Sequence, residues 1–217
     1  MANNTSGYTG YNATAVTDSV KGVIRAYNKL FEALSNESQS FINEMGRYWA
    51  CEQAQEFFNQ AFKPSTDELI KDVNTTYESV VSTMNFYAQK YADRMKGPFT
   101  PIKFNPAIKS MDTGAILTNI GGVRGVDETS AKMTLKKLTT MLSNVESALN
   151  ETKSAIADSG FVGGSQQTNL NNSIESIRKS VRTNTSTISE QTTKLIDKTI
   201  ADYGSIASEA SNAFSGQ

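Results

Sequence analysis

Apolar residues recur every three or four positions along most of this 217-residue chain. This spacing is typical of an α-helix that packs lengthwise on a partner helix. The first such stripe predicts a helix over about 16–47, with Thr17 or Asp18 as its cap. Its members are Val16, Val20, Val23, Tyr27, Leu30 or Phe31, Leu34, Phe41, Met45 and Tyr48.

A second stripe predicts a further helix up to about residue 95. Pro64 lies inside this stripe and removes a backbone hydrogen bond, so we expect a kink there, or a new helix that starts at Pro64 or Ser65. The stripe consists of Ala54, Phe57 or Phe58, Phe62, Leu69 or Ile70, Val73, Tyr77, Val80, Met84, Tyr87 and Tyr91.

Residues 96–127 have a different composition. "KGPFTPIKFNP" and "GGVRG" concentrate proline and glycine, which predicts a linker, with short helical pieces near 106–120. Beyond it, two more stripes predict helices on either side of the glycine-rich turn 158–168. The third is capped by Asp127, Thr129 or Ser130 and runs through Met133 or Leu135, Leu138, Leu142, Val145, Leu149 and Ile156. The fourth runs through Leu170, Ile174, Ile177, Val181, Ile188, Leu195 and Thr199.

These stripes predict an all-α fold of two long antiparallel helical hairpins, in a four-helix-bundle-like or elongated coiled-coil arrangement. The first hairpin is expected over 16–95 and the second over 128–207. The polar segments 1–15 and 208–217 are expected to be a flexible arm and a flexible tail.

Composition narrows the possible functions. The 21 basic and 22 acidic residues nearly cancel, which argues against nucleic-acid binding and electrostatic membrane binding. The chain has no His and a single Cys, so the common metal sites and Ser–His or Cys–His pairs are excluded. We therefore expect no enzyme activity, no catalytic residue, no metal and no cofactor. There is no apolar stretch near the ~20 residues of a membrane span and no Sec signal peptide, so export would need another route.

The turn between the first two helices carries the most distinctive residues. "GRYWACEQAQEFF" (46–58) holds the only Trp and the only Cys. Trp49 is expected to close the end of the hairpin, with Ala54 leaving room for its ring and Phe57 and Phe58 continuing the seam. An exposed Trp49 would instead anchor an interface. At the matching place in the second half stands Phe161. Farther along the second helix, Phe86, Tyr87 and Tyr91 are either core residues or a partner-binding patch.

The helix, the turn with Trp49, then Ala54 and Phe57 or Phe58, resemble the WXG100 (ESAT-6-like) and LXG superfamily of type VII secretion substrates. Cys51 stands where that family has Gly. The resemblance covers residues 16–95 and, with "FVGG" in place of the Trp turn, 128–205. It implies hairpins that pair into four-helix bundles and are exported without a Sec signal, often as partners of toxins. The family's Tyr-x-x-x-Asp/Glu export spacing occurs here only at Tyr48 and Glu52.

The resulting hypothesis is a non-enzymatic secreted protein that acts by helix–helix pairing. Its expected partners are a second copy, another WXG100/LXG-type helical protein or toxin, and the secretion ATPase. The alternatives are a pore-forming or extracellular structural helical protein, with "GAILTNIGGV" (114–123) as the candidate inserting segment, and a cytosolic coiled-coil scaffold or chaperone.

Overall fold

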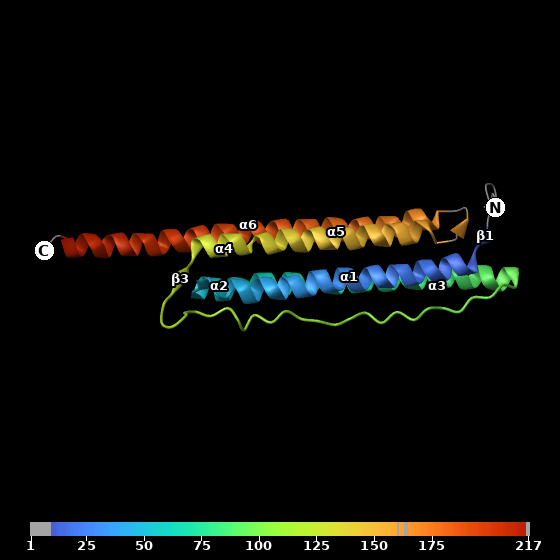
Figure 1. Cartoon of the computed structure of the whole chain (residues 1–217), viewed down its shortest axis with the longest axis horizontal. Helices are drawn as coiled ribbons and strands as arrows, with labels where there is room; N and C mark the ends of the chain where they lie inside the picture. Colours follow the sequence, from blue (N-terminus) through green and yellow to red (C-terminus); the bar gives the residue numbers. More distant parts are fainter. Residues whose placement is uncertain (1–9, 160, 163–164, 216–217) are drawn as a thin grey trace. The chain divides into compact units, whose positions relative to one another are not determined.

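The computed structural model describes residues 10–159, 161–162 and 165–215, and the side chains of 12–159, 165–206 and 208–209. The described part of the chain is 78% helix and 3% strand, so the fold is all-α, as the stripes predict. Figure 1 shows long helices joined by turns and by one extended connection. The elements, in chain order, are β1 (Gly10–Tyr11), α1 (Ala13–Met45), β2 (Trp49–Ala50), α2 (Glu52–Phe57), η1 (Phe58–Phe62), α3 (Lys63–Met95), β3 (Gly125–Val126), α4 (Glu128–Thr134), α5 (Lys136–Ala157), β4 (Phe161–Val162) and α6 (Gln166–Ser215).

The break expected near Pro64 is a π-helical turn. η1 is a five-residue π segment, and α3 begins at Lys63, so Pro64 occupies the second position of the new helix. Proline is tolerated there because the N–H groups of a first turn have no partner within their own helix. The π turn also places both Phe58 and Phe62 in the core.

Residues 96–124, which we call the connecting segment, contain no helix, and the short helical pieces expected near 106–120 are absent (Figure 1). The next helix starts where the capping pattern predicts. The Asp127 carboxylate accepts a hydrogen bond from the Ser130 N–H at 3.0 Å. This bond and that of the Ser130 hydroxyl hold the pKa of Asp127 below its usual value.

α6 has a different periodicity from the one expected. Its buried positions follow steps of four, three and four residues, an 11-residue repeat close to the period of a straight α-helix. Ile196 is therefore fully buried and Leu195, expected on the seam, is only half-buried. The half-buried Asn184 amide donates to the Ser65 carbonyl at 3.4 Å. The buried positions are Leu170, Ile174, Ile177, Val181, Thr185, Ile188, Thr192, Ile196 and Thr199.

The chain forms two compact units, each of which takes a part of α1, α3, α5 and α6. The first unit is Met1–Leu34, Ile70–Ile108 and Ser143–Val181, and the second is Ser35–Leu69, Lys109–Leu142 and Arg182–Gln217. Each unit is described below by itself.

In the first unit, helices from both halves of the sequence share one core. The Tyr27 ring lies 5.3 Å from the Tyr77 ring, which joins α1 to α3. The Tyr77 hydroxyl shares a 2.6 Å hydrogen bond with Thr152 of α5, and burial raises the pKa of Tyr77 despite this bond. Lys153 pairs with Glu175 at 2.7 Å and so joins α5 to α6. The two-residue strands β1 and β4 pair in the same unit.

In the second unit, an aromatic cluster fills the space between α1 and η1. Phe41 stacks on Phe62 with ring centroids 5.3 Å apart. The buried Ser38 hydroxyl contacts the Met141 sulfur at 3.3 Å, which brings α5 to the same core. Both units therefore bury side chains from helices that lie far apart in the sequence.

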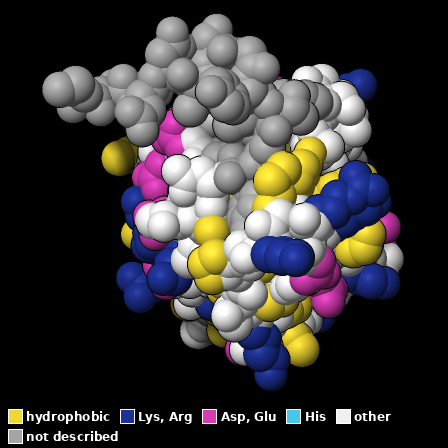
Figure 2. Space-filling view, turned by 90° about the vertical axis from the view of Figure 1, so that its right-hand side faces the viewer, with side chains coloured by type: hydrophobic (Ala, Val, Ile, Leu, Met, Phe, Trp, Pro, Cys, Tyr) yellow, Lys and Arg dark blue, Asp and Glu magenta, His cyan; other side chains and the backbone are white. Residues whose placement is uncertain are grey.

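The surface carries charges of both signs. On the side of the molecule drawn in Figure 2, Lys and Arg side chains lie among acidic and apolar ones. This distribution agrees with the nearly balanced formal charge of the chain.

Candidate interaction site

The Trp49 turn lies within the second unit, and the side chain of Trp49 is buried. Trp49 is 0% exposed and its ring lies 6.4 Å from Phe57 and 6.2 Å from Phe58. Ala54 and Cys51 are also fully buried, and Cys51 precedes α2 as its N-terminal flanking residue. Because the indole is inaccessible, Trp49 does not itself anchor an interface in this conformation.

A short strand pairing, not visible in the apolar pattern, fixes this turn. Trp49 pairs with Val126 and Ala50 with Gly125 in the antiparallel β2–β3 pair. The Asp127 N–H also donates to the carbonyl of Tyr48 at 2.7 Å. Gly125 has a φ of 149°, which favours glycine. The connecting segment thus returns to the Trp turn just before α4 begins.

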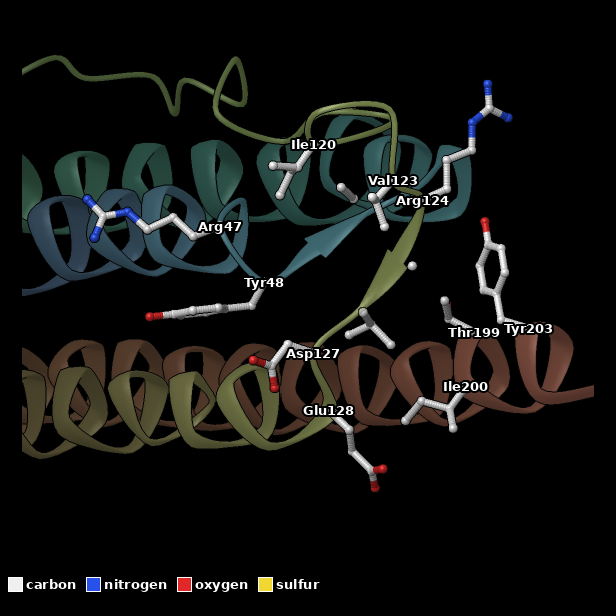
Figure 3. Close-up of a pocket in the computed structure, with 13 residues that line it drawn as sticks. Arg47, Tyr48, Ile120, Val123, Arg124, Asp127, Glu128, Thr199, Ile200 and Tyr203 are labelled. Carbon is white, nitrogen blue, oxygen red and sulfur yellow. The ribbon is translucent and has the colours of Figure 1, made fainter. Parts of the chain in front are cut away.

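An open groove of about 770 Å³ lies beside this strand pair (Figure 3). Three parts of the second unit line it: the turn that follows α1, the segment that leads to the start of α4, and one face of α6. Figure 3 shows Tyr203 rising from α6 toward β3, whereas Arg124 points away from the groove. The lining residues are Arg47, Tyr48, Ala50, Ile120, Val123, Arg124, Gly125, Val126, Asp127, Glu128, Thr199, Ile200 and Tyr203.

Apolar side chains are exposed at this groove and on α6 beyond it. Val123 is 70% exposed and Ile120 is 43% exposed. α6 continues past the start of α4 (Figure 1), and there Ile206 is 61% exposed. A surface helix normally buries its apolar stripe, whereas these apolar side chains are exposed. We call Ile120, Val123, Tyr203 and Ile206 the α6 surface.

The two residues with the export spacing lie at the edge of this region. Tyr48 is half-buried and lines the groove. Glu52 is exposed and pairs with Arg124 at 3.2 Å. Tyr48 immediately precedes the buried Trp49 in the sequence, and Glu52 follows it in the first turn of α2.

The other predicted patch lies in the first unit. Phe86 is 61% exposed, and its ring makes an edge contact with the half-buried Tyr87 at 5.3 Å. The Lys90 ammonium lies 5.8 Å from the centre of the Phe86 ring. Tyr91 is half-buried on the same helix. Phe161 belongs to β4, but its side chain lies outside the described part of the chain.

Pattern analysis missed a set of polar side chains that hold the connecting segment. In the first unit, the Asn85 side chain donates to the Ile102 carbonyl at 2.8 Å and accepts from the Ile102 N–H at 3.0 Å. The Tyr27 hydroxyl accepts from the Ala107 N–H at 2.7 Å, and Asn74 donates to the Ala107 carbonyl at 2.7 Å. Burial raises the pKa of Tyr27, and the bond from Ala107 opposes that rise.

In the second unit, a charged pair and an amide perform the same task. The Met111 N–H donates to Asp67 at 2.8 Å, and Lys63 donates to the Met111 carbonyl at 2.6 Å. Gln39 accepts from the Asp112 N–H at 2.8 Å and donates to the Asp112 carbonyl at 2.7 Å. Amides and charged residues on helix surfaces usually face solvent, so the apolar pattern gives no sign of this role.

The described residues contain no cluster of three or more His, Cys, Asp or Glu side chains with metal-binding geometry. No described helix is both long enough and apolar enough to cross a bilayer. No family model, curated protein or solved structure matches this chain.

Proposed function

We propose that this chain is a non-enzymatic, secreted protein of the WXG100/LXG kind, which acts by pairing its helices with a partner protein. It would serve as a type VII secretion substrate or as the targeting partner of a toxin. The observation that carries the proposal is the α6 surface, where the apolar side chains of Ile120, Val123 and Ile206 are exposed within the second unit. The sequence continues the same spacing at Ala210 and Phe214.

The proposal includes two antiparallel helical hairpins within one chain. In the first unit, Lys153 pairs with Glu175 and Glu146 pairs with Arg178, so residue numbers rise along α6 as they fall along α5. The short turn between α1 and α2 favours the same arrangement in the first half. Paired hairpins suit a protein that recruits a further helix, because each hairpin presents an apolar seam along its length.

The decisive test is secretion. The protein is blotted in washed cells and in culture medium, with and without a working type VII ATPase. We expect it in the medium only when the ATPase works. Retention in the cytosol in both strains would contradict export and favour the scaffold or chaperone alternative. Release in both strains, with leakage of dye-loaded liposomes, would favour the pore-forming alternative.

The role of the α6 surface is tested with the double variant Tyr203→Ser, Ile206→Ser. We expect its ATPase-dependent release to fall by roughly ten-fold, because exposed apolar anchors dominate helix-pairing interfaces. Ser208→Ala, at an exposed position on the same helix, is the matched control. Equal release of all three proteins would contradict a role for this surface.

A further inference from the structure

Residues 109–116 of the connecting segment lie on the second unit in the manner of a bound peptide. Both backbone groups of Met111 and both of Asp112 are hydrogen-bonded to side chains of α1 and α3. Further bonds join Ser110 to Asp67 at 2.6 Å and Lys109 to Asn36 at 2.7 Å. These side chains supply the contacts that a neighbouring β-strand would otherwise make to an extended chain.

Apolar contacts also hold residues 109–116 in place. Met111 is 2% exposed and Ile116 is 1% exposed, although the segment around them has no secondary structure. Ala115 approaches α1 so closely that a Cβ at Gly46 would overlap its carbonyl oxygen. The surface that includes Asn36, Gln39, Lys63 and Asp67, which we call the seat, therefore combines apolar sites for two side chains with polar groups that recognise the backbone between them.

This recognition is selective for an extended ligand. The backbone N–H and C=O groups of a helix are already bonded within the helix, so Gln39, Lys63 and Asp67 could not bond to them. A helix on this seat would leave those polar groups without partners, which costs free energy. An extended peptide satisfies them all.

We propose that the seat formed by Asn36, Gln39, Lys63 and Asp67 is a binding site for an extended peptide segment of a partner protein, and that residues 109–116 occupy it as an internal competitor. The ligand is extended at its first apolar residue and the next residue, where its N–H groups are free. It then turns, as residues 113–116 do with a 2.9 Å hydrogen bond from the Ile116 N–H to the Thr113 carbonyl, so that a second apolar residue follows five positions after the first. Gly121 and Gly122, with φ of 57° and 85°, lie where the segment would bend away. The site is distinct from the α6 surface and does not rest on the proposed function.

The probe is a fluorescein-labelled peptide with the sequence of residues 108–117, and its polarisation is measured with the full-length chain. A tethered competitor has an effective concentration near millimolar, so the wild-type chain should bind the peptide weakly. Met111→Ser weakens the internal competitor and leaves the seat intact. We expect it to raise the affinity for the peptide by at least roughly ten-fold. Ile108→Ser, at a position 96% exposed on the same segment, should change nothing.

Two further measurements test how the peptide is recognised. Gln39→Leu in the Met111→Ser background should reduce the affinity at least roughly ten-fold, whereas Gln53→Leu, at an exposed glutamine of α2, should leave it unchanged. A peptide N-methylated at the residue equivalent to Asp112 should also lose affinity, because it lacks the N–H that donates a hydrogen bond to the Gln39 side chain.

Circular dichroism establishes that each variant is folded. If Met111→Ser does not fold, Ser110→Ala replaces it, since this change removes only the hydroxyl that bonds to Asp67. Equal binding of the N-methylated peptide, or no gain in a folded variant with a weakened competitor, would overturn the proposal. Concentration-dependent dimers of the wild-type chain that the free peptide dissociates would assign the site to a second copy instead, and would overturn the partner assignment.

Discussion

The connecting segment is held by different chemistry in the two units. In the first unit, uncharged groups bond to the backbone of Ile102 and Ala107, and Phe104 makes an edge contact with the Tyr27 ring at 4.8 Å. In the second unit, the charged pair of Lys63 and Asp67 brackets Met111, whose side chain is buried. The backbone of the connecting segment is thus held by neutral groups in the first unit and by a charged pair in the second.

The two attachments should therefore respond to different perturbations. Neutral side-chain-to-backbone bonds depend on geometry and are little affected by salt or mild acid. The ion pair of Lys63 and Asp67 depends on the protonation state of the carboxylate and on ionic strength. The experiments below separate the two attachments, in order of decreasing expected effect.

Replacing Gly46 by Ala should have the largest effect. The new methyl group would overlap the Ala115 carbonyl oxygen, which is backbone and can move only if the segment shifts. We expect a loss of about 1–3 kcal/mol in the free energy of unfolding in urea. Gly22→Ala is the matched control in the first unit, where the Cβ meets only the Ala155 methyl group, at 3.0 Å. Equal losses in the two variants would show that the segment is not seated closely at Gly46.

Tyr27→Phe should weaken the neutral attachment by about 1–2 kcal/mol in the same urea measurement. The ring contacts with Tyr77 and Phe104 are retained, and only the hydroxyl that accepts from the Ala107 N–H is lost. Amide hydrogen exchange should become faster at Ala107 and stay unchanged at Met111. Faster exchange at both positions would mean that the two attachments are not independent.

Acid should release the charged attachment first. Burial alone raises the pKa of Asp67, but hydrogen bonds from Ser110, Met111 and Lys63 and the Lys63 charge outweigh it and hold the pKa below its usual value. The stabilisation from Asp67 is therefore present above about pH 4 and is lost as the pH falls through the lowered pKa. The amide NMR signal of Met111 should shift in this range, while that of Ile102 stays constant.

Alkali should act in the opposite sense on the first unit. The folded pKa of Tyr27 is raised, so its contribution is present below about pH 10 and is lost as the pH rises through the raised value. The Ala107 amide should then respond where the Met111 amide does not. A common response of both amides at either extreme of pH would contradict separate attachments.

The smallest effect should come from salt. The side chains of Lys63 and Asp67 are 34% and 27% exposed, so 1 M NaCl should reduce their contribution by less than about 1 kcal/mol. Lys63→Met should remove this salt dependence from the exchange rate of the Met111 amide. An unchanged salt dependence in that variant would place its origin elsewhere.

Much of the fold could be predicted from the sequence. The spacing of apolar residues indicated the helices that became α1, α3, α5 and α6, and Asp127, one of three candidate caps, is the cap of α4. The prediction that Thr17 or Asp18 caps the first helix was wrong, because α1 begins at Ala13. The prediction of helical pieces near 106–120 was wrong, and the seam position on α6 shifted from Leu195 to Ile196. A sequence window shows which face of a helix is apolar, but small deviations from a seven-residue repeat accumulate along a helix as long as α6.

The candidate sites were less accessible to sequence analysis. The unusual turn at Trp49 was identified, but its pairing with Val126 was not, because the two residues are far apart in the chain. Gln39 and Asn85 resemble ordinary solvent-facing residues of a helix. Their role appears only when a distant extended segment lies against them.

The local pattern was enough to predict that this chain is all-α and roughly where its long helices lie, although α1 begins at Ala13 and α6 extends to Ser215. Helix formation depends on local periodicity, capping and proline, all of which are encoded within a few residues. The tertiary structure was needed to show that the proline- and glycine-rich segment between α3 and β3 is bound along the helices, and that Ile206 of α6 is exposed while Tyr203 lines the groove. Both features depend on which distant backbone and side-chain groups meet.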